Sequence, residues 1–168
     1  MIEHEEERRP REHAAQLLTA AAYGTVLVLA ALPLLTPAEV ESGVGWELIA
    51  GVGVATWIAH LYAEAVGDHV RRGSALDGAE LRRAMSDGLP ILLAAVPPGV
   101  ALALGRLGVL EPNTARWTAV AVAIVQLVGV GVLVGSIVSK GRARTWSYAA
   151  ATALIGVGVV AIKLMLGH

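Results

Sequence analysis

The sequence predicts an all-α, polytopic membrane protein with five transmembrane helices, its N-terminus in the cytoplasm and its C-terminus outside. Three observations support this fold class. Hydrophobic residues make up 55% of the 168 residues and charged residues only 16%, whereas a typical soluble domain has about 25% charged residues. Five stretches reach the length of about 20 mostly apolar residues that a membrane-crossing helix needs. Arginine and lysine residues gather at alternate ends of these stretches, as expected because cytoplasmic loops carry the excess of basic residues.

The chain divides into a charged N-terminal extension, residues 1–13, and a single five-helix membrane domain, residues 14–168. The expected spans are residues 14–36, 45–67, 89–108, 117–138 and 146–166, and residues 68–88 form the longest loop. The N-terminal extension, this loop and the loop before the last span carry ten arginine and lysine residues, against three on the opposite side. We therefore expect loop 68–88 to be cytoplasmic and the protein to be an integral protein of the plasma membrane.

The N-terminal extension, "MIEHEEERRPREH", carries charges of both signs and lacks the apolar core and cleavage site of a signal peptide. His4 and its neighbouring glutamates could bind a metal ion, but a solvated helical extension is the favoured interpretation. The absence of cysteine excludes disulfides and thiolate metal sites. A net charge of −1 gives no electrostatic footprint for nucleic acid.

The second span contains the most informative segment, "WIAHLYAEAVGDH", in which ionisable side chains interrupt an otherwise apolar helix. His60, Glu64 and Asp68 recur every four residues and share one helical face with Trp57, whereas Tyr62 lies on another face. At 1.5 Å per residue, this face leads from about 6 Å below the membrane midplane at His60 to about 18 Å at Asp68. It therefore forms a polar ladder from the middle of the membrane toward the cytoplasm.

Ionisable side chains within a span are costly, and they often mark ion pathways or proton relays. His60 and Glu64 could jointly hold a cation or share a proton near neutral pH, so these two residues are the candidate metal ligands. In the alternative interpretation, the acidic side chain extends to the cytoplasmic surface and pairs with an arginine. That alternative is favoured for Asp68, and both interpretations stay open for His60 and Glu64.

The third span is expected to break in its middle, at Pro97 and Pro98 of "VPPGV". Proline removes a hydrogen-bond donor, so the carbonyl groups one turn earlier, around Ala94, lose their helical partners. Transporters often place binding sites at such interruptions; the alternative is a simple kink that fits the neighbouring helices. Gln126, midway along the fourth span, is expected to form an interhelical hydrogen bond rather than a ligand contact.

Two further patterns predict local structure. Asp77 followed by Glu80 is a capping-box arrangement, which predicts a helix start within loop 68–88. The stretch "GVLVG", from Gly131 to Gly135, offers the small residues through which helices in lipid associate. Contacts within one chain are favoured over contacts between chains.

The layout resembles the vacuolar iron transporter family. Shared features are five spans, a cytoplasmic N-terminus, a polar loop after the second span, a proline-broken third span, and the final stretch "VSKGRARTWSYAAATALIGVGVVAIKLMLG". "YAEAVGDH" stands where that family has a Gly-Glu-Tyr stretch, so the resemblance makes Glu64 the corresponding residue. The first span, "AAYGTVLVLAALPLL", lacks the family's aspartate, and the family's second-span methionine and glutamate-rich loop are missing. The resemblance implies the architecture and dimerisation, whereas the missing residues argue against iron transport by that family's mechanism.

The preferred function is a cation or proton-coupled transporter or channel that uses the polar ladder beside the broken third span. The residues assigned to this role are His60, Glu64, Tyr62, Asp68, Pro97, Pro98 and Gln126. No cofactor is indicated apart from a divalent cation, and no nucleophile–base–acid arrangement indicates an enzyme. The expected partners are the lipid bilayer and a second copy in a homodimer, without nucleic acid. The alternative function is a non-transporting membrane scaffold or accessory subunit whose buried polar residues fix helix packing.

Overall fold

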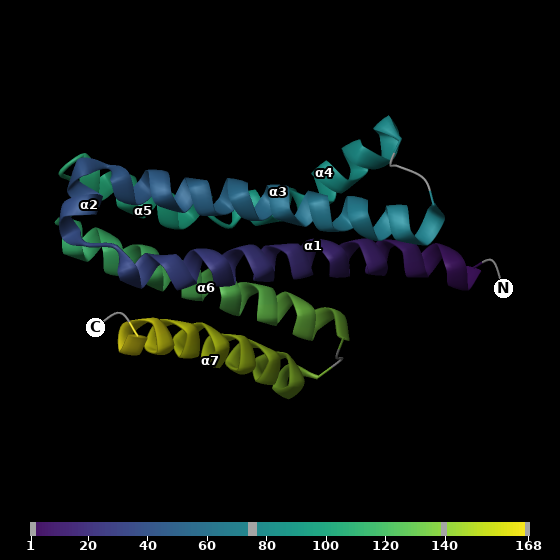
Figure 1. The fold of residues 1–168 in the computed structure, drawn as a ribbon. Helices are drawn as coiled ribbons and strands as arrows, with labels where there is room; N and C mark the ends of the chain where they lie inside the picture. Colours follow the sequence, from purple (N-terminus) through teal and green to yellow (C-terminus); the bar gives the residue numbers. More distant parts are fainter. Residues whose placement is uncertain (1–2, 74–76, 139–140, 167–168) are drawn as a thin grey trace.

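The computed structural model describes residues 3–73, 77–138 and 141–166, and every element within these ranges is a helix (Figure 1). In chain order the elements are α1 (Glu3–Ala31), the short 3-10 helix η1 (Leu32–Leu34), α2 (Pro37–Ser42), α3 (Val44–Arg72), α4 (Gly78–Leu93), α5 (Val96–Arg106), α6 (Pro112–Val138) and α7 (Arg142–Leu166). The all-α class is confirmed for the described residues. α1 begins at one end of the bundle and α7 ends at the other (Figure 1).

The expected spans correspond to four uninterrupted helical segments and one bent pair. Four segments are long and apolar enough to cross a membrane: His13–Leu34, Val44–Arg71, all of α6 and all of α7. α4 and α5 qualify only together, because each is too short alone, and the pair is bent by 43° at the break between them. The N-terminal extension continues α1 as a helix from Glu3 onward, which confirms the helical part of the favoured interpretation.

Loop 68–88 contains more helix than its polarity suggests. α3 continues to Arg72, and an ion pair between Asp68 and Arg71 lies in its last turn. α4 starts at the predicted capping box, in which Asp77 Oδ1 accepts from the Glu80 N–H at 2.7 Å and Glu80 Oε2 accepts from the Asp77 N–H at 3.1 Å. The capping box satisfies backbone N–H groups at the start of α4, and Gly73, with φ of 70°, caps the end of α3 by donating its N–H to the His69 carbonyl. Both helices therefore extend beyond their apolar segments.

The third span breaks at Ala94 and Ala95. Pro97 and Pro98 lie in the first turn of α5, where a missing N–H costs little. The carbonyl of Ala94 nevertheless loses a helical donor, and Gln126 Nε2 of α6 donates to it at 3.4 Å. The expected interhelical hydrogen bond of Gln126 is therefore present, and it stabilises the kink.

Close contacts between helices occur at glycines. A Cβ atom on Gly131 would lie 2.9 Å from a backbone oxygen of α7, and one on Gly135 would lie 2.7 Å from an α7 Cα atom. Gly24 of α1 approaches the backbone of Ile91 in α4 equally closely, at 2.8 Å. The predicted contact of "GVLVG" within the chain is therefore confirmed. The fully buried core lies toward the η1 end of the bundle and includes Val28, Leu29, Leu32, Ile49 and Leu102.

Candidate functional site

A cavity of about 440 Å³ lies between α1, α3 and α4, away from the apolar core. Its lining residues are Ala15, Gln16, Thr19, Ala20 and Tyr23 of α1, His60 and Glu64 of α3, and Asp87 of α4. Two other cavities, of about 480 Å³ between α3, α4 and α5 and about 540 Å³ between α1, α6 and α7, have almost wholly apolar walls. The predicted pair His60 and Glu64 therefore lines the most polar of these three cavities.

His60 and Glu64 lie one turn apart on α3, as their spacing predicts. His60 Nε2 is 3.5 Å from Glu64 Oε1, and the side chains are 30% and 40% exposed. The contact becomes an ion pair when His60 is protonated. The partial exposure leaves both groups accessible from the cavity, so the pair can exchange a proton or bind a cation there.

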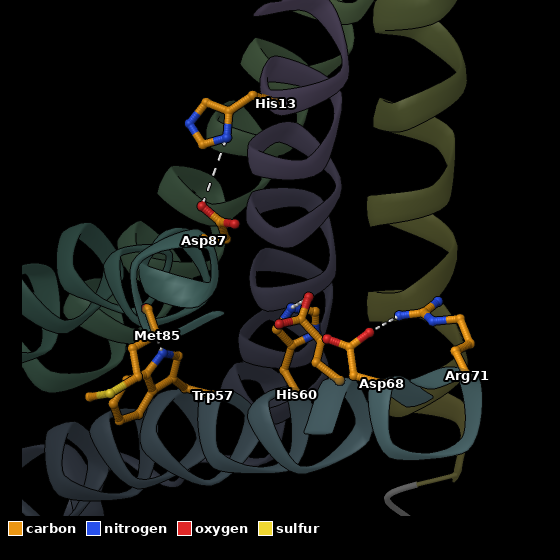
Figure 2. A network of polar contacts seen from close by, with 8 residues as sticks. His13, Trp57, His60, Asp68, Arg71, Met85 and Asp87 are labelled. Carbon is orange, nitrogen blue, oxygen red and sulfur yellow. Dashed lines mark hydrogen bonds and ion pairs between the residues drawn. The ribbon is translucent and has the colours of Figure 1, made fainter. Parts of the chain in front are cut away.

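The position of His60 depends on a close contact between α3 and α4 at Gly88. A Cβ atom on Gly88 would lie 2.9 Å from Trp57 Cδ1 and 3.4 Å from His60 Cδ2. Trp57 Nε1 also donates a hydrogen bond to the backbone carbonyl of Met85 at 3.3 Å (Figure 2). Trp57 is thus a positioning residue that holds α3 against α4 one turn from His60.

The other polar walls of the cavity were not identified from the sequence. Asp87 lines the cavity, and His13 Nδ1 of α1 lies 3.8 Å from Asp87 Oδ1 (Figure 2). Gln16, Thr19 and Tyr23 of α1 follow at intervals of three and four residues, which places them on one helical face. The spacing of these three α1 residues could have been recognised in the sequence as a polar helical face. The approach of Asp87 could not, because it depends on how α4 packs against α1.

Asp68 and Tyr62 do not line the cavity. Asp68 pairs with Arg71 on its own helix (Figure 2), as the alternative interpretation of this residue predicts. Tyr62 is 72% exposed on the outer surface of α3. Of the residues in the polar ladder, only His60 and Glu64 therefore line the cavity.

The break between α4 and α5 is also separate from the cavity. Gly53 of α3 packs against the break, and His60 lies seven residues farther along α3, about 10 Å at 1.5 Å per residue. Pro98 is fully buried, and neither it nor Pro97 lines the cavity. Gln126 is used at the kink, and its Oε1 is buried without a hydrogen-bond partner among the described atoms. The structure thus does not bring these three residues together with His60 and Glu64.

The described residues contain no group of three or more His, Asp or Glu side chains that could hold a metal ion. His60 and Glu64 alone supply two ligands, whereas structural zinc sites take four and calcium sites six to eight. The side chain of His4, the other metal candidate, lies outside the described part of the structure.

Compared with protein-family models, with curated proteins and with solved structures, the chain has no match. Its resemblance in layout to the vacuolar iron transporter family stays a prediction. The function must therefore be inferred from the cavity itself.

Proposed function

We propose that the chain is an integral protein of the plasma membrane that transports a cation in exchange for protons through the cavity of His60 and Glu64. One observation carries this proposal. Three packed helices, α1, α3 and α4, bring a histidine and two carboxylates, Glu64 and Asp87, around one partly exposed cavity. Ionisable groups arranged in this way within spans are typical of ion pathways and proton relays.

Membrane insertion is supported by the apolar outer surface. Ile58 of α3, Val125 of α6 and Leu154 of α7 are 55%, 69% and 73% exposed, and they lie in the middle of their helices. Extensive apolar surface of this kind is unfavourable in water and favourable against lipid. The distribution of basic residues favours a cytoplasmic N-terminus, and in that orientation the cavity lies in the cytoplasmic half of the membrane.

In this orientation the cavity serves as a vestibule open toward the cytoplasm. Glu64 binds the cation, and His60, about 6 Å nearer the midplane, receives or returns the proton that the carboxylate exchanges. Asp87 lies beside His13 at the cytoplasmic side, where its charge raises the local concentration of cations. The buried core around Leu32 and Leu102 closes the opposite end, so transport requires a second conformation.

We also propose a homodimer, because five spans leave little room for an enclosed pathway in one chain. Gly158 of α7 has no described neighbour within 4 Å of an added Cβ atom. This small-residue surface suits close packing against another helix in lipid. Light scattering and cross-linking of the purified protein would measure the number of chains.

The scaffold alternative also has a specific observation in its favour. Three of the residues assigned to transport have structural roles: Asp68 forms an ion pair, Gln126 forms a hydrogen bond at the kink, and Pro98 lies in the core. A scaffold would use His60 and Glu64 in the same way and would move no ions. Flux measurements separate the two functions.

The test is proton flux in liposomes that contain the purified protein and a trapped pH-sensitive dye. Gradients of several inorganic and organic cations are applied to the wild type, His60→Ala and Glu64→Gln. Glu47→Gln is the matched control, because it makes the same change on the exposed, opposite end of α3. We expect Glu64→Gln to abolish cation-driven proton flux, His60→Ala to lower it at least tenfold, and Glu47→Gln to leave it unchanged.

Thermal unfolding and chromatographic size confirm that each variant is folded and assembled. Equal flux in the wild type and Glu64→Gln would remove the cavity from the pathway. An absence of flux under every cation gradient would favour the scaffold.

A further inference from the structure

The cavity also indicates the chemical class of its cation, and this inference rests on the transport function proposed above. We infer that the cavity binds a small organic ammonium ion rather than a bare metal ion. The first reason is its size. A volume of about 440 Å³ falls within the range of roughly 300–1,000 Å³ found for small-molecule sites. A bare metal ion instead requires ligand atoms that converge at about 2.0–2.6 Å.

The second reason is the supply of ligands. Among the described residues no three His, Asp or Glu side chains converge, so a metal ion entering the cavity would exchange its hydration shell for too few protein ligands. An ammonium ion with alkyl substituents needs no such shell. It requires a nearby negative charge and a surface on which its alkyl groups can lie.

The third reason is the chemistry of the walls. Glu64 and Asp87 supply negative charge from two different helices, and the lining contains no arginine or lysine. Tyr23 of α1, 51% exposed, adds an aromatic ring at the edge that this cavity shares with the apolar cavity between α1, α6 and α7. Aromatic rings attract organic cations through their π faces. The small side chains of Ala15 and Ala20 leave room for alkyl groups.

The residues that line the cavity have separate roles in binding the organic cation. Glu64 pairs with the charge of the ammonium group and exchanges it for a proton, as in the proposed transport cycle. Tyr23 selects for an organic cation, because a ring face binds alkylated ammonium ions and supplies no inner ligand to a metal. Asp87 adds a second charge on the opposite helix, next to His13.

The experiment uses tetramethylammonium, which is permanently charged and cannot cross lipid in a neutral form. Calorimetry on the full chain in detergent compares it with tert-butanol, a neutral molecule of similar size, and with magnesium and manganese ions. We expect tetramethylammonium alone to bind. Asp87→Asn should weaken binding at least tenfold, Tyr23→Leu should weaken it at least threefold, and Tyr23→Phe should preserve it because the ring remains.

Tyr148→Leu is the matched control, because this tyrosine lines the apolar cavity and not the polar one. Equal binding to all variants, or tighter binding of magnesium or manganese, would overturn the organic-cation inference. If these metal ions drive Glu64-dependent proton flux while tetramethylammonium does not bind, the inference fails and the transport function stands. If tetramethylammonium binds in an Asp87-dependent way but no cation drives flux, the site stands and transport fails.

Discussion

Adding one methyl group at Gly88 tests how the site is assembled. A Cβ atom there would lie 2.9 Å from Trp57 Cδ1, 3.0 Å from its Nε1 and 3.4 Å from His60 Cδ2, and ordinary contacts begin at 3.4 Å. Gly88→Ala therefore requires the indole ring to move by roughly half an ångström in a close-packed region. That movement also weakens the hydrogen bond from Trp57 Nε1 to the carbonyl of Met85.

Three contributions set the size of the effect. Overpacking costs about 1–3 kcal/mol, and an interhelical hydrogen bond in a membrane protein contributes about 0.6 kcal/mol on average. Alanine within a helix regains about 0.5–1 kcal/mol relative to glycine. We therefore expect Gly88→Ala to lower the free energy of unfolding by about 0.6–3 kcal/mol and to lower His60-dependent flux.

The assay is reversible unfolding in mixed detergent and SDS, followed by circular dichroism. Gly51→Ala is the control, because a Cβ atom there meets no described atom within 4 Å, so the gain in helix propensity is not opposed by a clash. Phenylalanine lacks the indole five-membered ring, so Trp57→Phe should relieve part of the clash. The double variant should then show a coupling of at least about 0.5 kcal/mol. Equal stabilities of Gly88→Ala and Gly51→Ala, without coupling, would refute the described α3–α4 contact.

Three further predictions concern packing, pH and the kink. Gly135→Ala should destabilise the protein by about 1–3 kcal/mol because the methyl group meets the α7 backbone, whereas Gly129→Ala, which meets no described atom, should not; equal effects would contradict this contact. Hydrogen bonds from the Thr36 backbone N–H and hydroxyl lower the pKa of Glu39, so its contribution to stability is complete above the usual glutamate pKa of about 4.3 and is lost as the pH falls through the lower folded-state value. Glu39→Gln should therefore flatten the stability–pH curve in that acidic window, and an unchanged curve would show that the cap contributes nothing. Gln126→Leu should cost no more than about 1 kcal/mol, because its hydrogen bond is long and its Oε1 is unpartnered, and it should leave cation affinity unchanged; lost affinity would place this residue in the site.

Much of the fold could be predicted, because an apolar span must satisfy its backbone internally as a helix. The positions of the long apolar helical segments and the capping box at Asp77 both depend on residues close together in the sequence. The extension of α3 to Arg72 was harder to predict, because hydropathy shows where the apolar sequence ends and not where helical hydrogen bonding ends. The exact place of the break at Ala94, before the prolines, follows from the donors that the prolines lack.

The candidate site was predictable only in part. His60 and Glu64 were identified because their spacing places them on one face of one helix. The contact of His13 with Asp87 joins distant parts of the sequence and depends on the close approach of α1 and α4 at Gly24. The register of neighbouring helices also could not be predicted, and that register puts the kink about 10 Å from His60 instead of beside it.

The bend in the third span has a mechanical consequence. α4 packs against α1 and α3, and α5 packs mainly against α6, so the two halves of the bent pair contact mostly different helices. α1, α3 and α4 form a first group, which also contacts the rest of the bundle where α1 packs against α6. All walls of the polar cavity come from the first group. In the proposed transport cycle, bending at Ala94 and Ala95 would let that group move against the rest only if the contact between α1 and α6 shifts and the Gln126 hydrogen bond breaks. The cavity could then change the side it faces while its own side chains keep their mutual positions.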